Sequence, residues 1–393
     1  MKKVLSFILL FLFVPTFVLA SDTQTVSEEV NGDLLAPKAK SAILIEASTG
    51  KILFEKNSHE KLAPASMTKI MSMLLIIEHI ESGALKWDEM ITVSENASSM
   101  GGSQILLETG EQMSVKDLFK GVAVGSGNDA VVALAEAVAG TEDAFVEKMN
   151  QKVKELGLKD TMFKNPHGLD EANHYSSAYD MVMIGKELVK HEKVLEFTSI
   201  YEDYLRKGTD REFWLVNTNR MVKFNPIVDG LKTGFTSGAG YCLTATAKKN
   251  DMRLLATVMG EETTDIRTNE ITSLLDYGYA NYKIDTIVSK DTVIDSISVD
   301  KAKLEKVDII PIKDVSVLNK KSEKLGEISY SLDLKDFSLP IKKGDVIGKL
   351  KIKEDGKVIE NVDVTVSKDL EKINFLGLFN RYIRDILKGN ITF

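Results

Sequence analysis

Cysteine is almost absent from this chain of 393 residues, whose single thiol is that of Cys242. One thiol can form neither an internal disulfide nor a cysteine-based zinc site. The five histidines do not form an H-E-x-x-H pattern or a comparable metal-ligand spacing. We therefore expect no metal and no cofactor, and a fold that its hydrophobic core holds together.

Positive charge is not in excess either, because 50 lysine and arginine residues stand against 58 acidic residues, a formal net charge of −8. Such a chain has no global positive field to attract nucleic acid, so we expect no nucleic-acid partner. Hydrophobic residues, by contrast, make up 44% of the chain. This hydrophobic content and the length of the chain predict two domains, each with its own hydrophobic core, plus accessory segments.

Residues 1–20 have the features of a secretory signal peptide. Two lysines precede an apolar run that ends at Leu19, and Ala20 is a small residue at the usual cleavage position. The run is short for a membrane span and is interrupted by Pro15. We predict cleavage after Ala20, export of the chain, and a polar lead-in over 21–36. No cysteine follows the run, which excludes a lipoprotein.

Residues 37–282 have the pattern of one α+β unit. Alternating apolar residues predict a β-hairpin over 42–55, and strand-like stretches return over 227–260 after a helical middle. An early hairpin and late antiparallel strands imply a sheet assembled from both ends of this segment. Helical periodicity is present over about 67–80, 115–122, 129–139, 144–156, 177–191 and 269–280.

Two different patterns follow. Short runs of valine, isoleucine and leucine between turn signals predict a small all-β domain over 283–367. Over 368–390, apolar residues recur at three- and four-residue intervals, which predicts an amphipathic helix with a basic polar face. Such a helix lies in a membrane interface or packs on its own domain, and its position after a self-contained domain favours the membrane surface. The basic residues are Lys368, Lys372, Arg381, Arg384 and Lys388.

Three short motifs stand in a fixed order in the α+β segment: Ser66-Met67-Thr68-Lys69, Ser126-Gly127-Asn128 and Lys232-Thr233-Gly234. They match the patterns S-x-x-K, S-x-N and K-T-G. Alone, the first two have plain structural interpretations: a capping serine with a surface lysine, and a polar turn. S-x-x-K also occurs at Ser58 and at Ser298. The pattern alone is therefore not specific, and Ser66 is singled out by the order of the three motifs and by their local structural setting.

Ser66 and Lys69 are one helical turn apart, so an amine would lie beside a hydroxyl. This arrangement can activate a serine nucleophile where no histidine is at hand. A lysine acts as the base only when its pKa is lowered, which burial and a neighbouring cation would do, and Lys232 is a candidate for that cation. The helix start also leaves the Ser66 N–H available as one half of an oxyanion hole.

The other two motifs supply groups that would act on a peptide. Ser126 is suited to relay a proton to the leaving group, and Asn128 to hold the substrate amide. Lys232 and Thr233 begin a predicted edge strand, where a cation and a hydroxyl can bind a carboxylate. An extended peptide can pair with such an edge through main-chain hydrogen bonds.

The next two residues of that strand complete the expected site. Gly234 would let the backbone of a substrate approach closely. The N–H of Phe235 would then be the second donor of the oxyanion hole.

With these motifs the chain resembles the low-molecular-weight penicillin-binding proteins, the serine-type D-alanyl-D-alanine carboxypeptidases of the penicillin-recognising group. His167-Gly168-Leu169 and the residues around Lys232 are also of the family type, and the resemblance covers nearly all of 37–390. It implies an α+β domain like that of serine transpeptidases and β-lactamases. It also implies a peptidoglycan stem peptide as substrate, β-lactam antibiotics as ligands, and a location at the outer face of the cytoplasmic membrane.

The resemblance further implies a role for each motif residue. Ser66 would attack the carbonyl between two terminal D-alanines, Lys69 would take its proton, and Ser126 would help to protonate the departing D-alanine. Penicillin would acylate Ser66. Arg267 falls where relatives have another carboxylate-binding cation. Thr218 stands where some relatives have an arginine, which leaves part of the substrate contact unassigned.

Three alternatives stay open. A class A β-lactamase usually has aspartate where this chain has Gly127, and it needs a glutamate base in an E-x-x-L-N pattern that does not occur after Asn128. A transpeptidase would differ only in using an amine as acceptor in place of water. A catalytically silent penicillin-binding sensor would not need the polar motif residues, which this chain retains together with Asp229.

Overall fold

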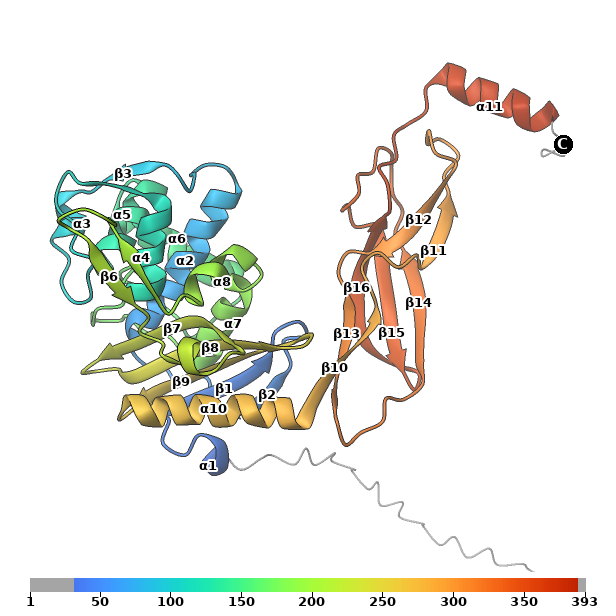
Figure 1. Cartoon of the computed structure of the whole chain (residues 1–393). Coiled ribbons are helices and arrows are strands. Elements are labelled where there is room, and N and C mark those ends of the chain that lie inside the picture. The colour runs from blue at the N-terminus through green and yellow to red at the C-terminus, as the bar shows by residue number, and fades with distance from the viewer. Residues whose placement is uncertain (1–31, 388–393) are drawn as a thin grey trace, which may run out of the picture.

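The computed structural model of the protein describes residues 32–387. The leader that we predict over 1–20, and most of the lead-in over 21–36, lie outside these residues. Figure 1 shows a body in which helices cover a sheet, then a separate β-rich part, and a last helix at the far end. The order confirms the predicted succession of an α+β domain, an all-β domain and a terminal helix.

The central sheet is antiparallel, with the strand order β2-β1-β9-β8-β7. The early hairpin of β1 (Ser41–Glu46) and β2 (Ile52–Lys56) pairs through β1 with the late strand β9 (Met252–Glu261). On its other side β9 pairs with β8 (Gly240–Lys249), and β8 pairs with β7 (Val228–Thr236). The sheet is therefore assembled from both ends of the segment, as predicted, and β7 is one of its edges.

Helices cover both faces of this sheet (Figure 1). Along β1 the side chains alternate: Ile43 and Ile45 join the core on the side of the large helical layer, and Leu44 joins the core under α10 (Thr264–Asn281). The helical layer is built around α2 (Lys69–Glu81), which is apolar and buried nearly all round. A helix packed on all sides is a rigid support for the residues at its ends.

The remaining helices of this domain are α1 (Gly32–Leu35), the 3₁₀ helix η1 (Ala65–Thr68), α3 (Glu95–Ser98), α4 (Val115–Gly125), α5 (Asn128–Ala139), α6 (Glu142–Glu155), α7 (Ala178–Leu188), α8 (Glu192–Thr198) and α9 (Met221–Phe224). Two short strand pairs accompany them: β3 (Met90–Thr92) with β4 (Gln112–Ser114), and β5 (Glu202–Leu205) with β6 (Phe213–Val216). Ser114, Thr141 and Ser177 accept backbone N–H groups at the starts of α4, α6 and α7, which satisfies donors that a helix start leaves open.

The β-rich part has two antiparallel sheets, with the orders β10-β13 and β11-β12-β16-β15-β14. Its own core includes Ile309, Leu350 and Val364. Tyr282, which we assigned to the first domain, already belongs to β10. The strands are β10 (Tyr282–Val288), β11 (Asp295–Ser298), β12 (Lys306–Pro311), β13 (Val315–Lys320), β14 (Ile328–Leu334), β15 (Gly348–Glu354) and β16 (Lys357–Val366).

The last helix begins later than the sequence pattern predicts. We expected it over 368–390, but α11 spans Phe375–Leu387, so Lys368 and Lys372 precede it. The cause is local, because Leu370 is buried and forms a β-bridge with Ile341 of the β-rich part. The Asn374 side chain then accepts the N–H of Gly377, as a residue at a helix start does.

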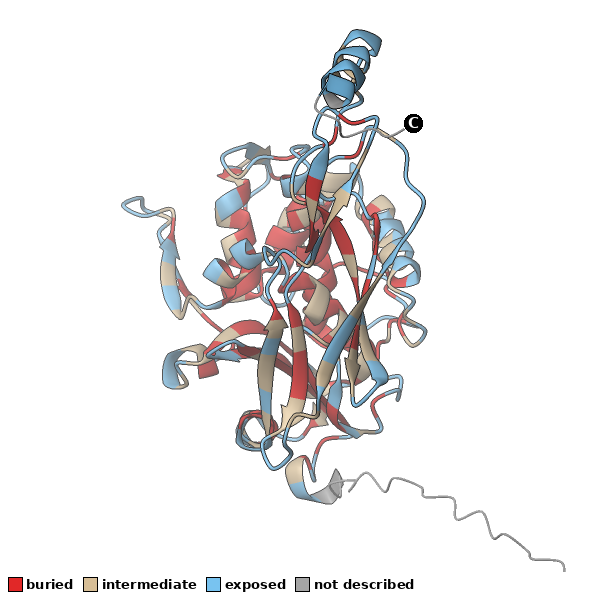
Figure 2. Cartoon of the chain, turned by 90° about the vertical axis from the view of Figure 1, so that its right-hand side faces the viewer, coloured by how far each residue is buried: buried red, intermediate tan, exposed pale blue. Residues whose placement is uncertain are grey.

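The basic face of α11 is turned towards the β-rich part. Arg381 donates to the carbonyl oxygens of Asp300 (3.0 Å), Ala302 (2.8 Å) and Lys303 (3.0 Å). Most of α11 is coloured as exposed at the upper end of Figure 2. Its exposed apolar residues are Phe375, Leu376, Phe379, Tyr382, Ile383, Ile386 and Leu387. Among the helices over 32–387, none is both long enough and apolar enough to cross a bilayer.

Two carboxyl groups are buried where β9 meets α10. The Glu270 carboxylate accepts the N–H groups of Lys38 (2.7 Å) and Ala39 (3.0 Å), which ties the chain before β1 to α10. Glu261 is 1% exposed, and in the described part of the chain its two oxygens have no hydrogen-bond partner. Burial and, next, the adjacent Glu270 raise the pKa of Glu261, so folding favours its protonated form.

Glu261 should therefore make the protein less stable as the pH rises. An unfolded glutamate has a pKa of about 4.3, whereas the folded protein keeps the Glu261 proton to higher pH. The free energy of unfolding thus falls between these two pKa values. Glu261→Gln stays neutral and should remove that fall, measured as the urea midpoint from about pH 5 to about pH 8.

The neighbouring Glu262 is exposed, so Glu262→Gln is the matched control and should keep the wild-type pH dependence. Wild-type and Glu261→Gln curves that ran parallel over this range would contradict the raised pKa.

Candidate active site

Ser66 lies in the turn between β2 and α2, where η1 packs against the edge strand β7. The sequence predicted Ser66 at the start of an α-helix. The structure has a 3₁₀ turn there instead, and the α-helix begins at Lys69. Ala65, just before the serine, has a φ of +47°, a left-handed conformation that costs a residue with a Cβ on the order of 1–3 kcal/mol. The surrounding packing must hold this turn.

Two glycines let neighbouring segments close on the turn. A Cβ on Gly168 would lie 1.8 Å from the carbonyl oxygen of Ala65, and one on Gly234 would lie 2.7 Å from that of Pro64. We predicted that Gly234 makes room for a substrate backbone. The structure adds a second reason for glycine here, because a Cβ on Gly234 would meet the turn that carries Ser66.

Lys69 is fully buried and surrounded by polar oxygens. Its Nζ lies 3.0 Å from Ser66 Oγ, 2.6 Å from Asn128 Oδ1 and 2.7 Å from the His167 carbonyl oxygen. Burial holds the pKa of Lys69 well below its ordinary value, and the nearby Lys232 cation lowers it further, against an opposing effect of Asp129. The cation beside Lys69 is thus the one that the sequence indicated.

The segment Ser126–Asn128 is a buried tight turn between α4 and α5. Ser126 has a φ of +62°, and Asn128 is the first residue of α5. Asn128 donates its side-chain amide to the carbonyl of Gly101 (2.7 Å) and its backbone N–H to that of Ser103 (2.7 Å). The structure therefore brings Asn128 of the second motif to Lys69, and residues 101–107 fold over the start of α5.

Lys232 and Arg267 bring two more positive charges to the site. The Lys232 side chain is 1% exposed, and its Nζ donates to the Thr233 carbonyl (3.1 Å). Burial, and then the charge of Arg267, lower the pKa of Lys232 to about 7. Arg267 reaches this region from α10, is nearly buried, and its Nε has no hydrogen-bond partner among the residues described.

Thr233 donates its hydroxyl proton to Thr218 Oγ1 (2.8 Å), so the residue that replaces an expected arginine contacts the third motif. Phe235 is half exposed and stacks on Tyr241 at a centroid distance of 4.3 Å. Asp229 does not join the site, because its carboxylate forms two hydrogen bonds of 2.8 Å with Arg253.

Comparison with known proteins shows the family to which the chain belongs. A family model described as D-alanyl-D-alanine carboxypeptidase, Peptidase S11, matches residues 24–263, which contain all three motifs. The chain belongs to this family. A second model, the C-terminal domain of penicillin-binding protein 5, matches residues 282–372. The protein is a serine-type D-Ala-D-Ala carboxypeptidase that acts in peptidoglycan metabolism.

Individual relatives match between 61% and 99% of this chain. D-alanyl-D-alanine carboxypeptidase DacF of Bacillus subtilis is 47% identical over 393 residues, which cover 99% of this chain and 100% of the relative. The crystal structures of penicillin-binding protein 5 from Haemophilus influenzae match with 34% identity and a TM-score of 0.69, covering 85% of this chain and 98% of that one. The cefotaxime-bound form of penicillin-binding protein D2 from Listeria monocytogenes matches with 29% identity and a TM-score of 0.56, covering 61% and 97%.

Some residues that support the carboxypeptidase site do not belong to the three motifs. His174 Nδ1 accepts the N–H of Lys164 (3.1 Å), so its Nε2 carries the proton and donates to Thr68 Oγ1 (2.9 Å). Burial, with His167 as the second cause, lowers the pKa of His174 to about 4, so this ring is neutral. Nothing in the sequence pattern singled out His174, because its partner is more than a hundred residues away.

Proposed function

We propose that Ser66 is the nucleophile of the carboxypeptidase and that Lys69 is its base. The supporting observation is the set of three oxygens around Lys69 Nζ. A neutral amine has two N–H groups, and the Asn128 and His167 oxygens, at 2.6 and 2.7 Å, accept both. Its lone pair is then left for the hydroxyl proton of Ser66, whose Oγ is 3.0 Å away.

In this mechanism Ser66 Oγ bonds to the carbonyl carbon of the penultimate D-alanine while its proton passes to Lys69. The backbone N–H groups of Ser66 and Phe235 stabilise the oxyanion. The C–N bond then breaks, and the leaving D-alanine takes a proton from Lys69 through Ser126. Water hydrolyses the resulting acyl ester, and the second product retains the fourth residue as its C-terminus.

The terminal carboxylate of the substrate binds to Lys232, with Thr233 as a hydroxyl donor and Arg267 as a second cation. The burial of both cations supports this, since a carboxylate entering between them would relieve their mutual repulsion. Asn128 also holds the substrate amide, and the peptide pairs with the edge of β7 at Gly234.

β-Lactam antibiotics acylate the same serine. The family binds these compounds, and the relative from Listeria monocytogenes has structures with cefotaxime and with ampicillin bound. A β-lactam presents a strained amide beside a carboxylate, so Ser66 and Lys232 would engage it as they engage the peptide.

The exposed apolar face of α11 lies on the outer surface of the cytoplasmic membrane after export. The basic side of the helix is bonded to the β-rich part through Arg381, so the apolar side faces away from the protein. An apolar helical face of this kind inserts into the headgroup region of a bilayer.

The nucleophile is tested with the mature chain, without residues 1–20, and its Ser66→Ala variant. The variant should form no adduct with fluorescent penicillin and should release D-alanine from a pentapeptide at least about a thousandfold more slowly, since nucleophile deletions have effects of this order. Ser298→Ala, at the exposed S-x-x-K copy in β11, is the control and should react like the wild type. An adduct that survives Ser66→Ala would refute the assignment.

Carboxylate binding by Lys232 predicts a decline of activity at alkaline pH. Its pKa of about 7 means that the cation is present below that pH and is lost above it. The kcat/KM for D-alanine release reports the free enzyme, so it should fall as the pH rises through about 7. Lys232→Arg keeps its charge and should shift this fall beyond about pH 9. A fall at the same pH in both proteins would assign it to another group.

Membrane binding by α11 is tested by ending the chain at Lys372, which keeps the β-bridges of Leu370 and Lys372. The mature full-length chain should sediment with anionic lipid vesicles, and the shortened chain should stay in solution. Phe379→Ser with Ile383→Ser should weaken binding at least about tenfold without shortening the chain, because two exposed apolar side chains are lost. Equal sedimentation of all three proteins would place the anchor elsewhere.

A further inference from the structure

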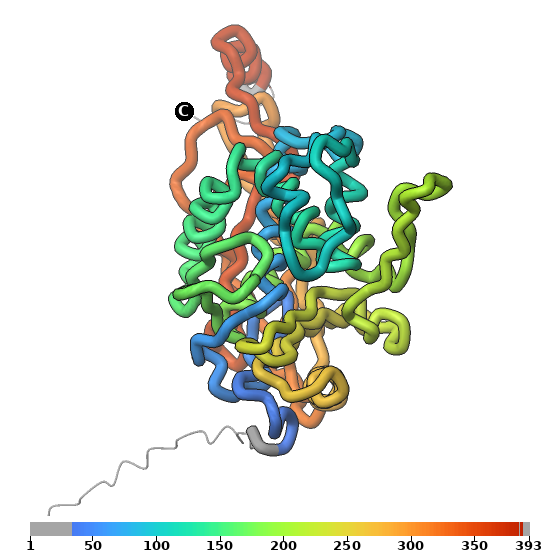
Figure 3. Tube along the Cα trace, turned by 90° about the vertical axis from the view of Figure 1, so that its left-hand side faces the viewer, coloured from blue at the N-terminus to red at the C-terminus, as the bar shows by residue number. Residues whose placement is uncertain are grey.

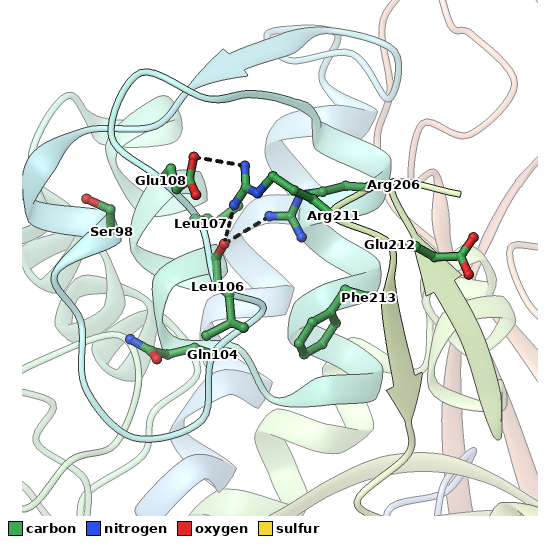
Figure 4. Close-up of a pocket in the computed structure, with 9 residues that line it drawn as sticks. All are labelled: Ser98, Gln104, Leu106, Leu107, Glu108, Arg206, Arg211, Glu212 and Phe213. Carbon is green, nitrogen blue, oxygen red and sulfur yellow. Dashed lines mark hydrogen bonds and ion pairs between the residues drawn. The ribbon is translucent and has the colours of Figure 1, made fainter. Parts of the chain in front are cut away.

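A cavity of about 410 Å³ opens beside the active site, between the segment that folds over Asn128 and the hairpin of β5 and β6. Figure 3 shows this hairpin projecting from the body of the molecule. Gln104, Leu106 and Glu108 line one wall, and Arg211 and Phe213 line the other (Figure 4). The catalytic assignments above use none of these side chains.

The wall that contains Leu106 is held in an unfavourable backbone conformation. Leu106 has a φ of +57°, which is rare for a large side chain, and its side chain is 57% exposed. Its carbonyl oxygen accepts hydrogen bonds from Arg206 (3.3 Å) and Arg211 (2.9 Å) of the hairpin. The two arginines therefore fix an apolar side chain at the cavity mouth, where it is in contact with water.

Both walls continue directly into the active site. Ser103, next to Gln104, accepts the backbone N–H of Asn128 at 2.7 Å. On the other side, Phe213 begins the strand that leads to Thr218, whose hydroxyl contacts Thr233. A peptide bound across the site would thus have this cavity on its flank.

The lining combines apolar surface with charges of opposite sign. Leu106 and Phe213 offer surface to an aliphatic chain. Arg211 forms an ion pair with the Glu111 carboxylate (3.1 Å) and a second one with Glu108 (3.2 Å), whose side chain is 69% exposed. An adjacent cation and anion complement a group that carries an ammonium and a carboxylate on one carbon.

We propose that this cavity binds the side chain of the third residue of the stem peptide, and that it selects a diamino acid ending in an amino-carboxylate group. The inference rests on the proposed function, because it needs the peptide in the site around Ser66. Two extended residues span about 7 Å, so the third residue is close enough to the scissile bond for a long side chain to reach the flank of the site. Glu108 would hold its ammonium group and Arg211 its carboxylate.

The test uses three pentapeptides that differ only at the third residue: meso-diaminopimelate, L-lysine or L-alanine. The mature wild type should release D-alanine from the diaminopimelate peptide with a kcat/KM at least about tenfold above that for the alanine peptide, with lysine between them. Glu108→Gln should reduce this ratio by about tenfold, because the ammonium group loses its partner. Arg211→Gln should reduce the preference for diaminopimelate over lysine.

Lys207→Gln is the matched control. Lys207 lies in the same hairpin and pairs with Asp203, but it does not line the cavity, so all three substrates should keep their wild-type order. Glu108→Gln is the deciding variant, since Arg211 also holds the Leu106 carbonyl and the Glu111 carboxylate.

Wild-type rates that are equal for the three peptides, a preference for lysine over diaminopimelate, or a ratio unchanged by Glu108→Gln would each overturn the proposal. Those results leave the carboxypeptidase mechanism intact. Failure to release D-alanine from any of the peptides would instead contradict the proposed function itself.

Discussion

The closeness of two buried lysines is the constraint on which this active site depends. Lys69 and Lys232 are both almost inaccessible to water, and each lies in the positive field of another cation. Removing an ammonium group from water penalises its charged form, and a like charge nearby adds to the penalty. The two lysines therefore cannot both keep an ordinary pKa, and a neutral amine beside Ser66 is the outcome that the geometry favours.

Such a pair requires a rigid support, which the sheet with helices packed on both faces provides. Lys69 begins a helix buried nearly all round, and Lys232 lies on a strand joined to the rest of the sheet. The turn that carries Ser66 is strained at Ala65, and it persists because Gly168 and Gly234 let a loop and a strand close on it. Core packing on both faces of the sheet offsets this local strain.

Local sequence patterns account for much of this architecture. The three-residue spacing of Ser66 and Lys69 predicts that an amine meets a hydroxyl, and apolar alternation predicts the hairpin and the edge strand that carries Lys232. Contacts between distant residues leave no such pattern. The bond from His174 to Thr68, and the approach of Pro64 to Gly234, depend on how the layers meet. They become visible only in three dimensions.

The same difference between local patterns and contacts of distant residues explains why α11 departs from its predicted bounds. Apolar periodicity correctly indicates an amphipathic helix. It does not show which basic residues of the polar face bind to the protein itself. In the structure Leu370 belongs to the β-rich part, which delays the helix, and Arg381 is bound to three carbonyl oxygens. Because the arginine is held by the protein, it contributes less to attraction by anionic lipid than a free cation would. Its bonds instead fix which side of α11 faces outwards. The apolar face should therefore contribute more to membrane binding than the electrostatic attraction of the basic residues does.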